Sequence, residues 1–448
     1  MAVIAEKCIN IKVTVLDINK EKIDLWNSDD LSLLPVYEPG LKEIVSKVRN
    51  KNLFFSSDIE KNIAEADIVF ISVNTPTKEK GLGAGYASDL KWVESSARTV
   101  AKFAKNHTIV VEKSTLPVRT AELIKKILEE SSSLEKSEVN NSFSVLSNPE
   151  FLSEGSAIND LRNPDRVLIG GDDKVATSLL SSIYENWIPK EKILLTNLWS
   201  SELSKLTANA FLAQRISSIN SISALCEATG AEIKEVSGAV GLDKRIGSKF
   251  LNSGPGFGGS CFQKDILNLV YICRFYGLNE VADYWESVVS INNWQRRRIS
   301  SIVIQKLFGT ITSKKLAILG FSFKANTNDT RESPAIFISK DLFENGAFLS
   351  FHDPKVSESQ IKNILDKEVV KQNNQSFEWE YQSDLYDAIN SADAVLILTE
   401  WFEYSMIDWS KCYKLMRKPA WIFDTRNIVN SSEVKSAGIN YWGVGNGS

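Results

Sequence analysis

A cysteine follows a glycine-rich segment a little beyond the middle of the chain. Four glycines lie within Gly254–Gly259, Cys261 comes two residues later, and Lys264 and Asp265 are close behind. Glycine tolerates positive φ and lets a backbone approach a ligand closely. If a helix begins near Cys261, its N-terminal dipole would favour the thiolate, which is the nucleophilic form of cysteine. The pattern predicts a catalytic nucleophile, and the alternative is a buried structural thiol.

Two other short segments carry polar groups that a reaction could use. Lys205 and Asn209 are four residues apart, so on a helix they share one face. Glu150 and Glu154 follow the apolar segment 144–146, and carboxylates just beyond a strand lie where open α/β sheets bind ligands. The alternatives are a solvated lysine in the first segment and helix-capping acids in the second.

The elements that must position these residues alternate between strands and helices. Apolar runs at 13–16, 66–73 and 108–112 predict buried strands, and 93–104 has helical periodicity. Continuous apolar strands separated by helices indicate a parallel sheet.

The C-terminal part of the chain repeats this pattern. Strand-like runs occur at 315–320, 349–352 and 391–398, and the last of them matches 65–72 almost position by position. Two such halves predict an α/β fold with two Rossmann-like parallel-sheet domains, related by an old duplication.

A helical segment separates the two halves. Residues 200–307 are rich in Ala, Leu, Glu and Ser with helical periodicity, and 208–225 predicts one long helix. We interpret this segment as a helical connector and a dimer surface.

The first half lacks a strand that the second half has. In the second half the opening strand ends at Gly320, 33 residues before Asp353, and the matching acid of the first half is Asp17. The corresponding strand, with the G-x-G-x-x-G turn that meets a dinucleotide's pyrophosphate, would precede Met1. We therefore expect the first strand to be missing and interpret Met1 as an internal methionine of an N-terminally truncated chain. The alternative is that this half never bound a dinucleotide.

Composition argues against several classes of protein. The chain has 448 residues, 43% of them hydrophobic and 24% charged, which is typical of a multidomain globular protein. A net charge of −4 argues against a nucleic-acid-binding face, and no apolar run reaches the roughly 20 residues of a membrane helix. Five scattered cysteines and two histidines argue against a disulfide framework and a zinc site, so we expect no metal. These features favour a cytoplasmic protein in which Cys8, Cys226, Cys273 and Cys412 only pack.

Several motifs carry a resemblance to a known family. They are Leu34–Gly40, Ser72–Thr77, Glu112–Thr115, Ser147–Leu152, Glu202–Leu206, Ala208–Gln214, the Cys261 segment, Phe323–Lys324 and Asp329–Ser333. With these motifs in order along the whole chain, the sequence resembles the UDP-glucose/GDP-mannose dehydrogenase family, and within it the animal-type members that act on UDP-glucose. The resemblance implies an NAD-binding domain at 1–198, a helical dimerisation core with the catalytic cysteine at 199–308, and a UDP-sugar-binding domain at 309–448.

The resemblance also implies a reaction. UDP-glucose would be oxidised to UDP-glucuronate by two successive hydride transfers to NAD, through a thiohemiacetal and a thioester on Cys261. The residues implied to act in it are Cys261 as nucleophile, Lys205 for the oxyanion, Asp265 and Thr115 for the water, Glu150 as general acid or base, and Asn209 on the reacting oxygen. The implied partners are UDP-glucose and further copies of the chain in a dimer or hexamer.

Binding residues follow from the same resemblance. The sugar nucleotide would contact Phe151, Leu152, Glu154, Arg245, Phe257, Gly258, Phe323, Lys324 and Arg426. NAD would contact Asp17, Lys22, Val73, Asn74, Thr75, Pro76, Thr77, Ser114, Thr115, Glu154 and Arg331.

The chain departs from the family's pattern in its missing glycine fingerprint and at Lys22, where a point charge replaces the planar fork of an arginine. Two alternatives stay open. One is a truncated, non-catalytic chain that binds UDP-sugar or assembles with complete subunits. The other is an enzyme acting on a different nucleotide sugar, such as GDP-mannose, which the motifs disfavour.

Overall fold

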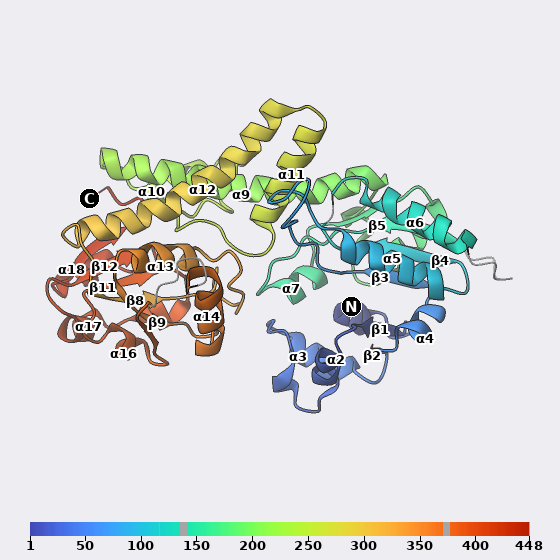
Figure 1. Cartoon of the computed structure of the whole chain (residues 1–448), viewed down its shortest axis with the longest axis horizontal. Coiled ribbons are helices and arrows are strands. Elements are labelled where there is room, and N and C mark those ends of the chain that lie inside the picture. Colours follow the sequence, from blue (N-terminus) through green and yellow to red (C-terminus); the bar gives the residue numbers. More distant parts are fainter. Residues whose placement is uncertain (116, 135–141, 371–376, 448) are drawn as a thin grey trace. The chain divides into compact units, whose positions relative to one another are not determined.

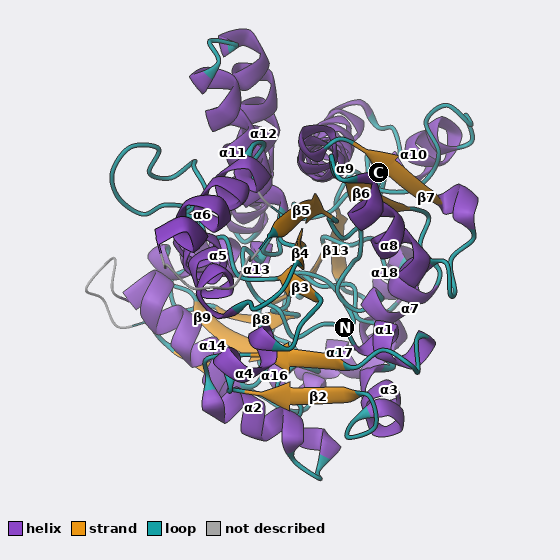
Figure 2. Cartoon of the chain, turned by 90° about the vertical axis from the view of Figure 1, so that its right-hand side faces the viewer, coloured by secondary structure: helices purple, strands orange, loops and turns teal. Residues whose placement is uncertain are grey.

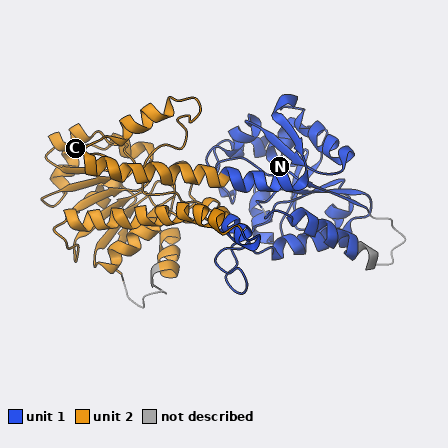
Figure 3. Ribbon diagram, turned by 90° about the horizontal axis from the view of Figure 1, so that it is seen from above, with its two compact units in different colours: residues 1–208, 267–277 blue, residues 209–266, 278–448 orange. Residues whose placement is uncertain are grey.

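The computed structural model describes residues 1–115, 117–134, 142–370 and 377–447. It divides into unit 1, residues 1–208 and 267–277, and unit 2, residues 209–266 and 278–448 (Figure 3). Two helices, α9 (Leu198–Thr229) and α11 (Phe262–Phe275), contribute residues to both units (Figure 1). The expected boundaries of three domains, after residues 198 and 308, stay a prediction.

Unit 2 is built on a six-stranded parallel sheet in the order β10-β9-β8-β11-β12-β13. Its strands are β8 (Lys315–Leu319), β9 (Phe348–His352), β10 (Trp379–Tyr381), β11 (Ala394–Ile397), β12 (Trp421–Asp424) and β13 (Asn440–Gly443). Its further helices are α10 (Ile233–Gly241), α12 (Asn279–Lys306), α13 (Pro334–Glu344), α14 (Glu358–Leu365), α16 (Leu385–Ile389), α17 (Trp409–Leu415) and α18 (Ser431–Ser436) (Figures 1 and 2).

Two separate cores lie on the two faces of this sheet. Leu316 and Ile318 of β8 enter one core, and Ala317 and Leu319 enter the other. Because successive side chains of a strand point to opposite faces, both faces are covered and the strand must be apolar throughout. This burial explains why β11 and the residues of β8 after Lys315 are continuous apolar runs in the sequence.

Unit 1 contains two separate sheets. β1 (Val13–Leu16) pairs in parallel with β2 (Leu53–Ser56), and a second sheet has the order β3-β4-β5-β6-β7. The strands of that sheet are β3 (Ile68–Ile71), β4 (Thr108–Glu112), β5 (Phe143–Ser147), β6 (Val167–Gly170) and β7 (Ile193–Thr196), and only the β5–β6 pair is antiparallel. The helices are α1 (Ala2–Lys7), α2 (Lys20–Asn27), α3 (Leu41–Val48), α4 (Ile59–Ala64), α5 (Lys91–Phe103), α6 (Thr120–Leu134), α7 (Ala157–Arg162) and α8 (Lys174–Tyr184). Mostly parallel strands connected through helices confirm the predicted α/β class.

The break between the sheets of unit 1 falls where the sheet of unit 2 has its first strand. In unit 2, β8 lies between β9 and β11, whereas the described residues place no strand between their counterparts β1 and β3. Every residue of β11 is buried, but Ile68, Val69 and Phe70 of β3 are only partly buried. α1 precedes β1 as α13 precedes β9, so α1 takes the place of the helix after the first strand. The described residues of unit 1 therefore form two separate sheets where unit 2 forms one.

The long helix of the central segment begins earlier than the sequence indicates. α9 starts at Leu198 instead of near residue 208, and the Asn197 side chain caps it by accepting the Ser200 N–H at 2.8 Å. The polar residues Glu202 and Lys205 of its first turns are buried, so their polarity gives no sign of a packed helix. Although α9 has 32 residues, none of the helices that the structure describes is both long and apolar enough to cross a membrane.

Candidate active site

Cys261 lies at the head of α11. The helix begins at Phe262, and the carbonyl oxygen of Cys261 accepts the Asp265 N–H at 2.8 Å, so Cys261 occupies the capping position. Its side chain is exposed, whereas the other four of the five cysteines are buried. A helix N-terminus favours negative charge and hence a thiolate. Cys261 is therefore the cysteine placed to react.

Two buried polar residues accompany Cys261 in unit 2. Asp265, one helical turn further along α11, is 1% exposed, and Asn209 of α9 is 5% exposed. Asn209 Nδ2 donates to Asp265 Oδ2 at 2.6 Å, and Lys264 Nζ lies 3.7 Å from Asp265 Oδ1. An amide on one oxygen and an ammonium near the other fix the orientation of the carboxylate.

The glycine-rich segment Gly254–Gly259 packs closely against another loop of unit 2. A Cβ at Gly258 would lie 2.5 Å from the Glu332 carbonyl oxygen and 2.9 Å from Phe323 Cβ, so a larger residue does not fit. Phe257 is buried and meets the ring of Phe262 edge-on, with centroids 5.9 Å apart. These contacts make glycine necessary at this approach of two backbones.

The predicted substrate-binding residues of unit 2 gather beside this segment. Arg426 Nη2 donates to the Phe323 carbonyl oxygen at 3.0 Å, and the Lys324 ammonium lies 5.5 Å from the centre of the Phe323 ring. A Cβ at Gly254 would lie 3.5 Å from Arg426 Nη1. The structure thus brings together Phe257, Gly258, Phe323, Lys324 and Arg426.

Lys205 of unit 1 is a buried cation beside an aromatic ring. Its side chain is 7% exposed, and its ammonium lies 5.4 Å from the centre of the Phe151 ring. The Arg166 guanidinium lies 3.8 Å from the same ring centre. The quadrupole of the ring attracts both cations and helps to hold them beside Phe151. Arg166 carries no local sequence signal, and sequence reasoning missed it.

A small cavity of about 30 Å³ adjoins Phe151 in unit 1. Lys113, Glu150, Leu152 and Asp160 are among the residues that line it. The buried Asn148 supports its wall, since its side-chain oxygen accepts from Lys113 Nζ at 3.2 Å and from the Tyr184 hydroxyl at 2.6 Å. The turn after β5 thereby places the predicted residues Glu150, Phe151 and Leu152 around one opening.

The loops after β3 and β4 are tied together at the carboxyl ends of those strands. Thr75 Oγ1 donates to the Thr115 carbonyl oxygen at 3.1 Å, and Ser114 Oγ donates to the Val73 carbonyl oxygen at 2.7 Å. Ligands of open α/β sheets bind at this edge. The structure therefore places Thr115 within the group of predicted cofactor-binding residues, which also includes Asn74, Pro76 and Thr77.

Asp17 stands directly after β1, as the resemblance requires of an acid that binds a ribose. Its Oδ1 accepts the Asn19 N–H at 2.8 Å, its Oδ2 lies 4.0 Å from Lys22 Nζ, and 38% of its side chain is exposed. A partly exposed carboxylate at a strand end suits the hydroxyls of an adenine ribose. Asp17 and the loops after β3 and β4 thus fit NAD, while the described residues of unit 1 contain no G-x-G-x-x-G turn for its pyrophosphate.

Three predicted residues stand apart from these groups. The Arg245 side chain is 89% exposed and pairs with Asp243, with Nη2 to Oδ2 at 2.6 Å. The Arg331 side chain pairs with Asp329 in unit 2, with Nη2 to Oδ2 at 2.6 Å, whereas the other predicted cofactor residues belong to unit 1. Glu154 is half-buried in the turn before α7.

Unit 1 also contains a pair of buried carboxyl groups that sequence reasoning missed. Glu112 ends β4 and is 2% exposed, and Glu202 of α9 is 3% exposed. Glu202 accepts the backbone N–H groups of Arg119 at 2.6 Å and Ala121 at 2.8 Å, at the start of α6. Burial, and then the charge of Glu202, raises the pKa of Glu112 well above its ordinary value, so Glu112 keeps its proton and donates it to Glu202.

Replacing Glu112 with glutamine is expected to stabilise the chain at alkaline pH. The free energy of unfolding of the unchanged chain should fall as the pH rises from about 4.5, because the unfolded Glu112 ionises there and the folded one does not. Each unit by which the pKa is raised corresponds to about 1.4 kcal/mol. Glutamine can still donate to Glu202 but cannot ionise, so the fall should be smaller in Glu112→Gln, where only Glu202, whose pKa burial also raises, contributes to it. Denaturant unfolding at several pH values measures the difference, with Glu60→Gln at an exposed position of α4 as the control. Equal pH profiles for the unchanged chain and Glu112→Gln would contradict the raised pKa of Glu112.

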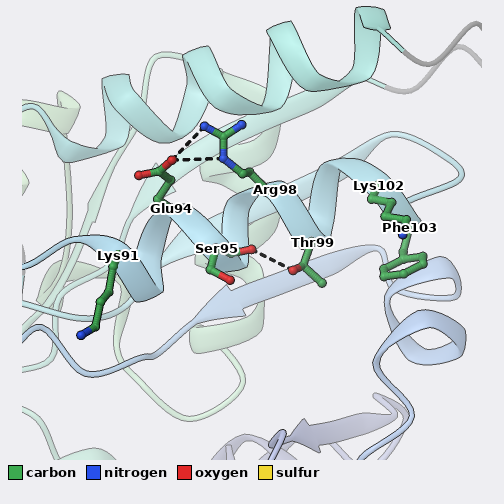
Figure 4. A pocket seen from close by; sticks show the side chains of 7 residues that line it. All are labelled: Lys91, Glu94, Ser95, Arg98, Thr99, Lys102 and Phe103. Atoms are coloured by element: carbon green, nitrogen blue, oxygen red, sulfur yellow. Dashed lines mark hydrogen bonds and ion pairs between the residues drawn. The ribbon is translucent and has the colours of Figure 1, made fainter.

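A wider hollow of about 540 Å³ lies along α5, away from these residues (Figure 4). Its lining consists of Lys91, Glu94, Ser95, Arg98, Thr99, Lys102 and Phe103. Arg98 Nη2 donates to Glu94 Oε1 at 2.8 Å, one helical turn apart. This lining contains no predicted site residue, so we do not place the active site there.

Two α/β units with polar groups at strand ends are typical of nucleotide-binding enzymes. Comparisons identify the family: its NAD binding domain matches residues 1–188, its central domain 199–294, and its UDP binding domain 317–431. The chain belongs to the UDP-glucose/GDP-mannose dehydrogenase family. This membership confirms the resemblance and NAD as the cofactor.

Individual relatives cover nearly the whole chain. It is 56% identical over 448 residues to the UDP-glucose 6-dehydrogenase of Caenorhabditis elegans, covering 99% of this chain and 92% of that one. It is 53% identical over 451 residues to the Bos taurus enzyme of the same name, covering 99% and 90%. A solved UDP-glucose dehydrogenase from Pyrobaculum islandicum superposes with a TM-score of 0.83 at 29% identity, covering 99% of this chain and 94% of that one.

Proposed function

We propose that this chain oxidises UDP-glucose to UDP-glucuronate, with NAD as the acceptor of a hydride from C6 in each of two steps. The observation that carries the proposal is the exposed thiol of Cys261 at the head of α11. Relatives named UDP-glucose 6-dehydrogenase, 52–56% identical along 99% of the chain, support it over a non-catalytic binding role. In this proposal residues 1–198 bind NAD, 199–308 carry the cysteine, and 309–448 bind the UDP-sugar.

Cys261 divides the oxidation into easier steps. The C6 alcohol first loses a hydride and a proton to become an aldehyde. The Cys261 thiolate then adds to the aldehyde carbon, and the oxygen takes up a proton, which gives a thiohemiacetal. Loss of a second hydride and of that proton gives a thioester. Water adds to the thioester carbon, the C–S bond breaks, and the products are the carboxylate, the free thiolate and protons.

Lys205 stabilises the negative oxygen that develops at C6. Its ammonium is nearly excluded from water, so its field on a neighbouring oxyanion is screened little. The Phe151 ring beside it attracts the ammonium and helps to hold it in place. Lys205 therefore acts when charge forms in the transition state.

The remaining catalytic roles are those that the resemblance to the family implies. Asp265 orients and activates the hydrolytic water, because its carboxylate is held by Asn209 and Lys264. Thr115 assists in placing that water, Glu150 exchanges protons as general acid or base, and Asn209 holds the reacting oxygen.

Binding roles complete the proposal. UDP-glucose contacts Phe151, Leu152, Glu154, Arg245, Phe257, Gly258, Phe323, Lys324 and Arg426. NAD contacts Asp17, Lys22, Val73, Asn74, Thr75, Pro76, Thr77, Ser114, Thr115, Glu154 and Arg331.

Replacing Asp17 with alanine is expected to weaken the binding of NAD and not that of UDP-glucose. The variant loses charge-assisted hydrogen bonds to the ribose, so KM for NAD should rise about tenfold while KM for UDP-glucose stays unchanged. Steady-state kinetics with each substrate varied in turn measure this, and Asp29→Ala is the control. Equal effects on both KM values would remove Asp17 from the cofactor site.

The same proposal includes assembly of the chain with itself, as a dimer or hexamer. Phe211 and Leu225 of α9 are 55% and 57% exposed, and Leu242, just after α10, is 84% exposed. Exposed apolar groups on one helical region indicate an interface. Light scattering measures the mass in solution, and a monomer would contradict the proposed assembly.

A cytoplasmic location belongs to the proposal as well, because five unpaired cysteines suit a reducing compartment.

The substrate is tested by supplying NAD with one nucleotide sugar at a time and measuring NADH. NADH is expected with UDP-glucose and not with GDP-mannose or UDP-N-acetylmannosamine. Preference for GDP-mannose would place the chain in another branch of the family. Binding of UDP-glucose without NADH would establish the non-catalytic alternative.

A further inference from the structure

Three buried side chains of α12 hold the backbone of the segment before Cys261. Asn292, Gln295 and Arg296 are 0%, 0% and 2% exposed, and their spacing of three and four residues puts them on one face of the helix. Each donates to a backbone carbonyl of that segment. The bonds run from Asn292 to Phe257 at 3.1 Å, from Gln295 to Gly254 at 2.9 Å, and from Arg296 to Phe257 at 2.7 Å.

The amide of Asn292 pairs with both backbone groups of Phe257, because its Oδ1 also accepts the Phe257 N–H at 2.8 Å. A Cβ at Gly256, which has a φ of +119°, would lie 2.6 Å from this Oδ1. The Gly254 N–H donates to Asn220 Oδ1 of α9 at 2.8 Å. The segment therefore takes its shape from the side chains of two helices.

Arg296 joins this segment to a second loop. Its Nη2 also donates to the Glu332 carbonyl oxygen, at 3.1 Å, and its guanidinium lies 4.0 Å from the centre of the Phe337 ring. Burial lowers the pKa of Arg296 to about 10, against the opposing charge of Glu332, so the group stays charged at neutral pH. One buried cation thus fastens two main-chain segments.

Burying a cation costs desolvation free energy, and an apolar residue of similar volume often stabilises the folded chain as much. The cation supplies directed donors that an apolar residue lacks. The Gly259 N–H, which donates to the Arg331 carbonyl oxygen at 2.8 Å, completes the attachment two residues before Cys261. The backbone that presents the exposed thiol is therefore held from both sides.

We propose that Arg296, with Asn292 and Gln295, is a positioning residue that fixes the Cys261 loop for catalysis. The inference rests on the proposed role of Cys261 as nucleophile. A displacement of about 1 Å in a reacting group costs about 100-fold in rate. Loosening the loop should lower kcat and leave substrate binding largely intact.

The test compares Arg296→Met with Arg297→Met, its exposed neighbour on α12. Arg296→Met is expected to lower kcat about 100-fold while both KM values change less than about threefold. Arg296→Lys, which keeps the charge but not the planar fork of donors, should recover part of kcat, and Arg297→Met should behave as the unchanged chain. Asn292→Leu, which retains the cation, serves as the second variant if Arg296→Met does not fold, and kcat should fall in it too.

Hydrogen exchange of residues 254–261 provides a readout that needs no turnover. In Arg296→Met the backbone amides of residues 254–261 should exchange about tenfold faster. The amides of strands β8, β9 and β11 should exchange at unchanged rates. An Arg296→Met chain with unchanged kcat, or with unchanged exchange in the segment, would overturn the proposal. Failure of the unchanged chain to form NADH would defeat the proposed function instead, and the exchange result would still decide whether Arg296 holds the loop.

Discussion

Replacing Cys261 with serine is expected to stop the formation of UDP-glucuronate. A serine hydroxyl is far less ionised than a thiol, so it does not add to the aldehyde at a useful rate. The loss in overall turnover should be on the order of 1,000-fold or more, as for other enzymes deprived of their nucleophile. The first oxidation does not require the thiol, so aldehyde-level product should accumulate on the enzyme.

Rapid-mixing measurement of NADH checks this result. Cys261→Ser should give up to one NADH per active site and then stall. The fold should persist, because Cys261 is exposed and supports no core. Ser260→Ala is the matched control, because it removes only the hydroxyl that lies 3.4 Å from the Cys261 sulfur and leaves the nucleophile in place, so its turnover should change far less. Steady NADH production by Cys261→Ser would remove Cys261 from the mechanism.

Replacing Lys205 with alanine is expected to lower kcat by about 100-fold to 1,000-fold, the usual effect of losing one preorganised oxyanion donor. The field of a buried ammonium acts mainly on charge that forms in the transition state, so the KM values should move little. The free energy of unfolding should not fall much, because the variant buries one charge fewer.

Steady-state kinetics and denaturant unfolding together test the role of Lys205. The control is Lys174→Ala at the exposed first position of α8. A higher KM for UDP-glucose with an unchanged kcat would reassign Lys205 to binding. A large loss of stability would instead make it a structural residue.

Strands were predictable from unbroken apolar runs, which burial on both faces explains for β4 and β8, whereas in β1 only Val13 is buried. The runs at 13–16 and 108–112 coincide with β1 and β4, and 315–320 contains β8. The start of α9 was not predictable, because its first turns carry buried polar groups such as Glu202 in place of an apolar stripe. Comparing the two halves of the sequence predicted their similar order of strands, and both units do contain parallel strands connected through helices.

The candidate site was predictable only where chemistry is concentrated in a short segment. Cys261, Asp265 and the preceding glycines stand together in the sequence, and α11 does begin directly after the cysteine. Arg296 meets the Phe257 carbonyl oxygen 39 residues away in the chain, and Glu112 meets Glu202 from a different element. Such contacts depend on tertiary packing, and no local pattern of residue types records them.

The most direct measurement is the number of NADH molecules formed from each UDP-glucose when the sugar nucleotide is limiting and NAD is in excess. Oxidation of an alcohol to a carboxylate removes four electrons, so the account predicts two NADH per UDP-glucose, with UDP-glucuronate as the product. One NADH per sugar and a free aldehyde would contradict the covalent mechanism, and no NADH at all would contradict the proposed activity.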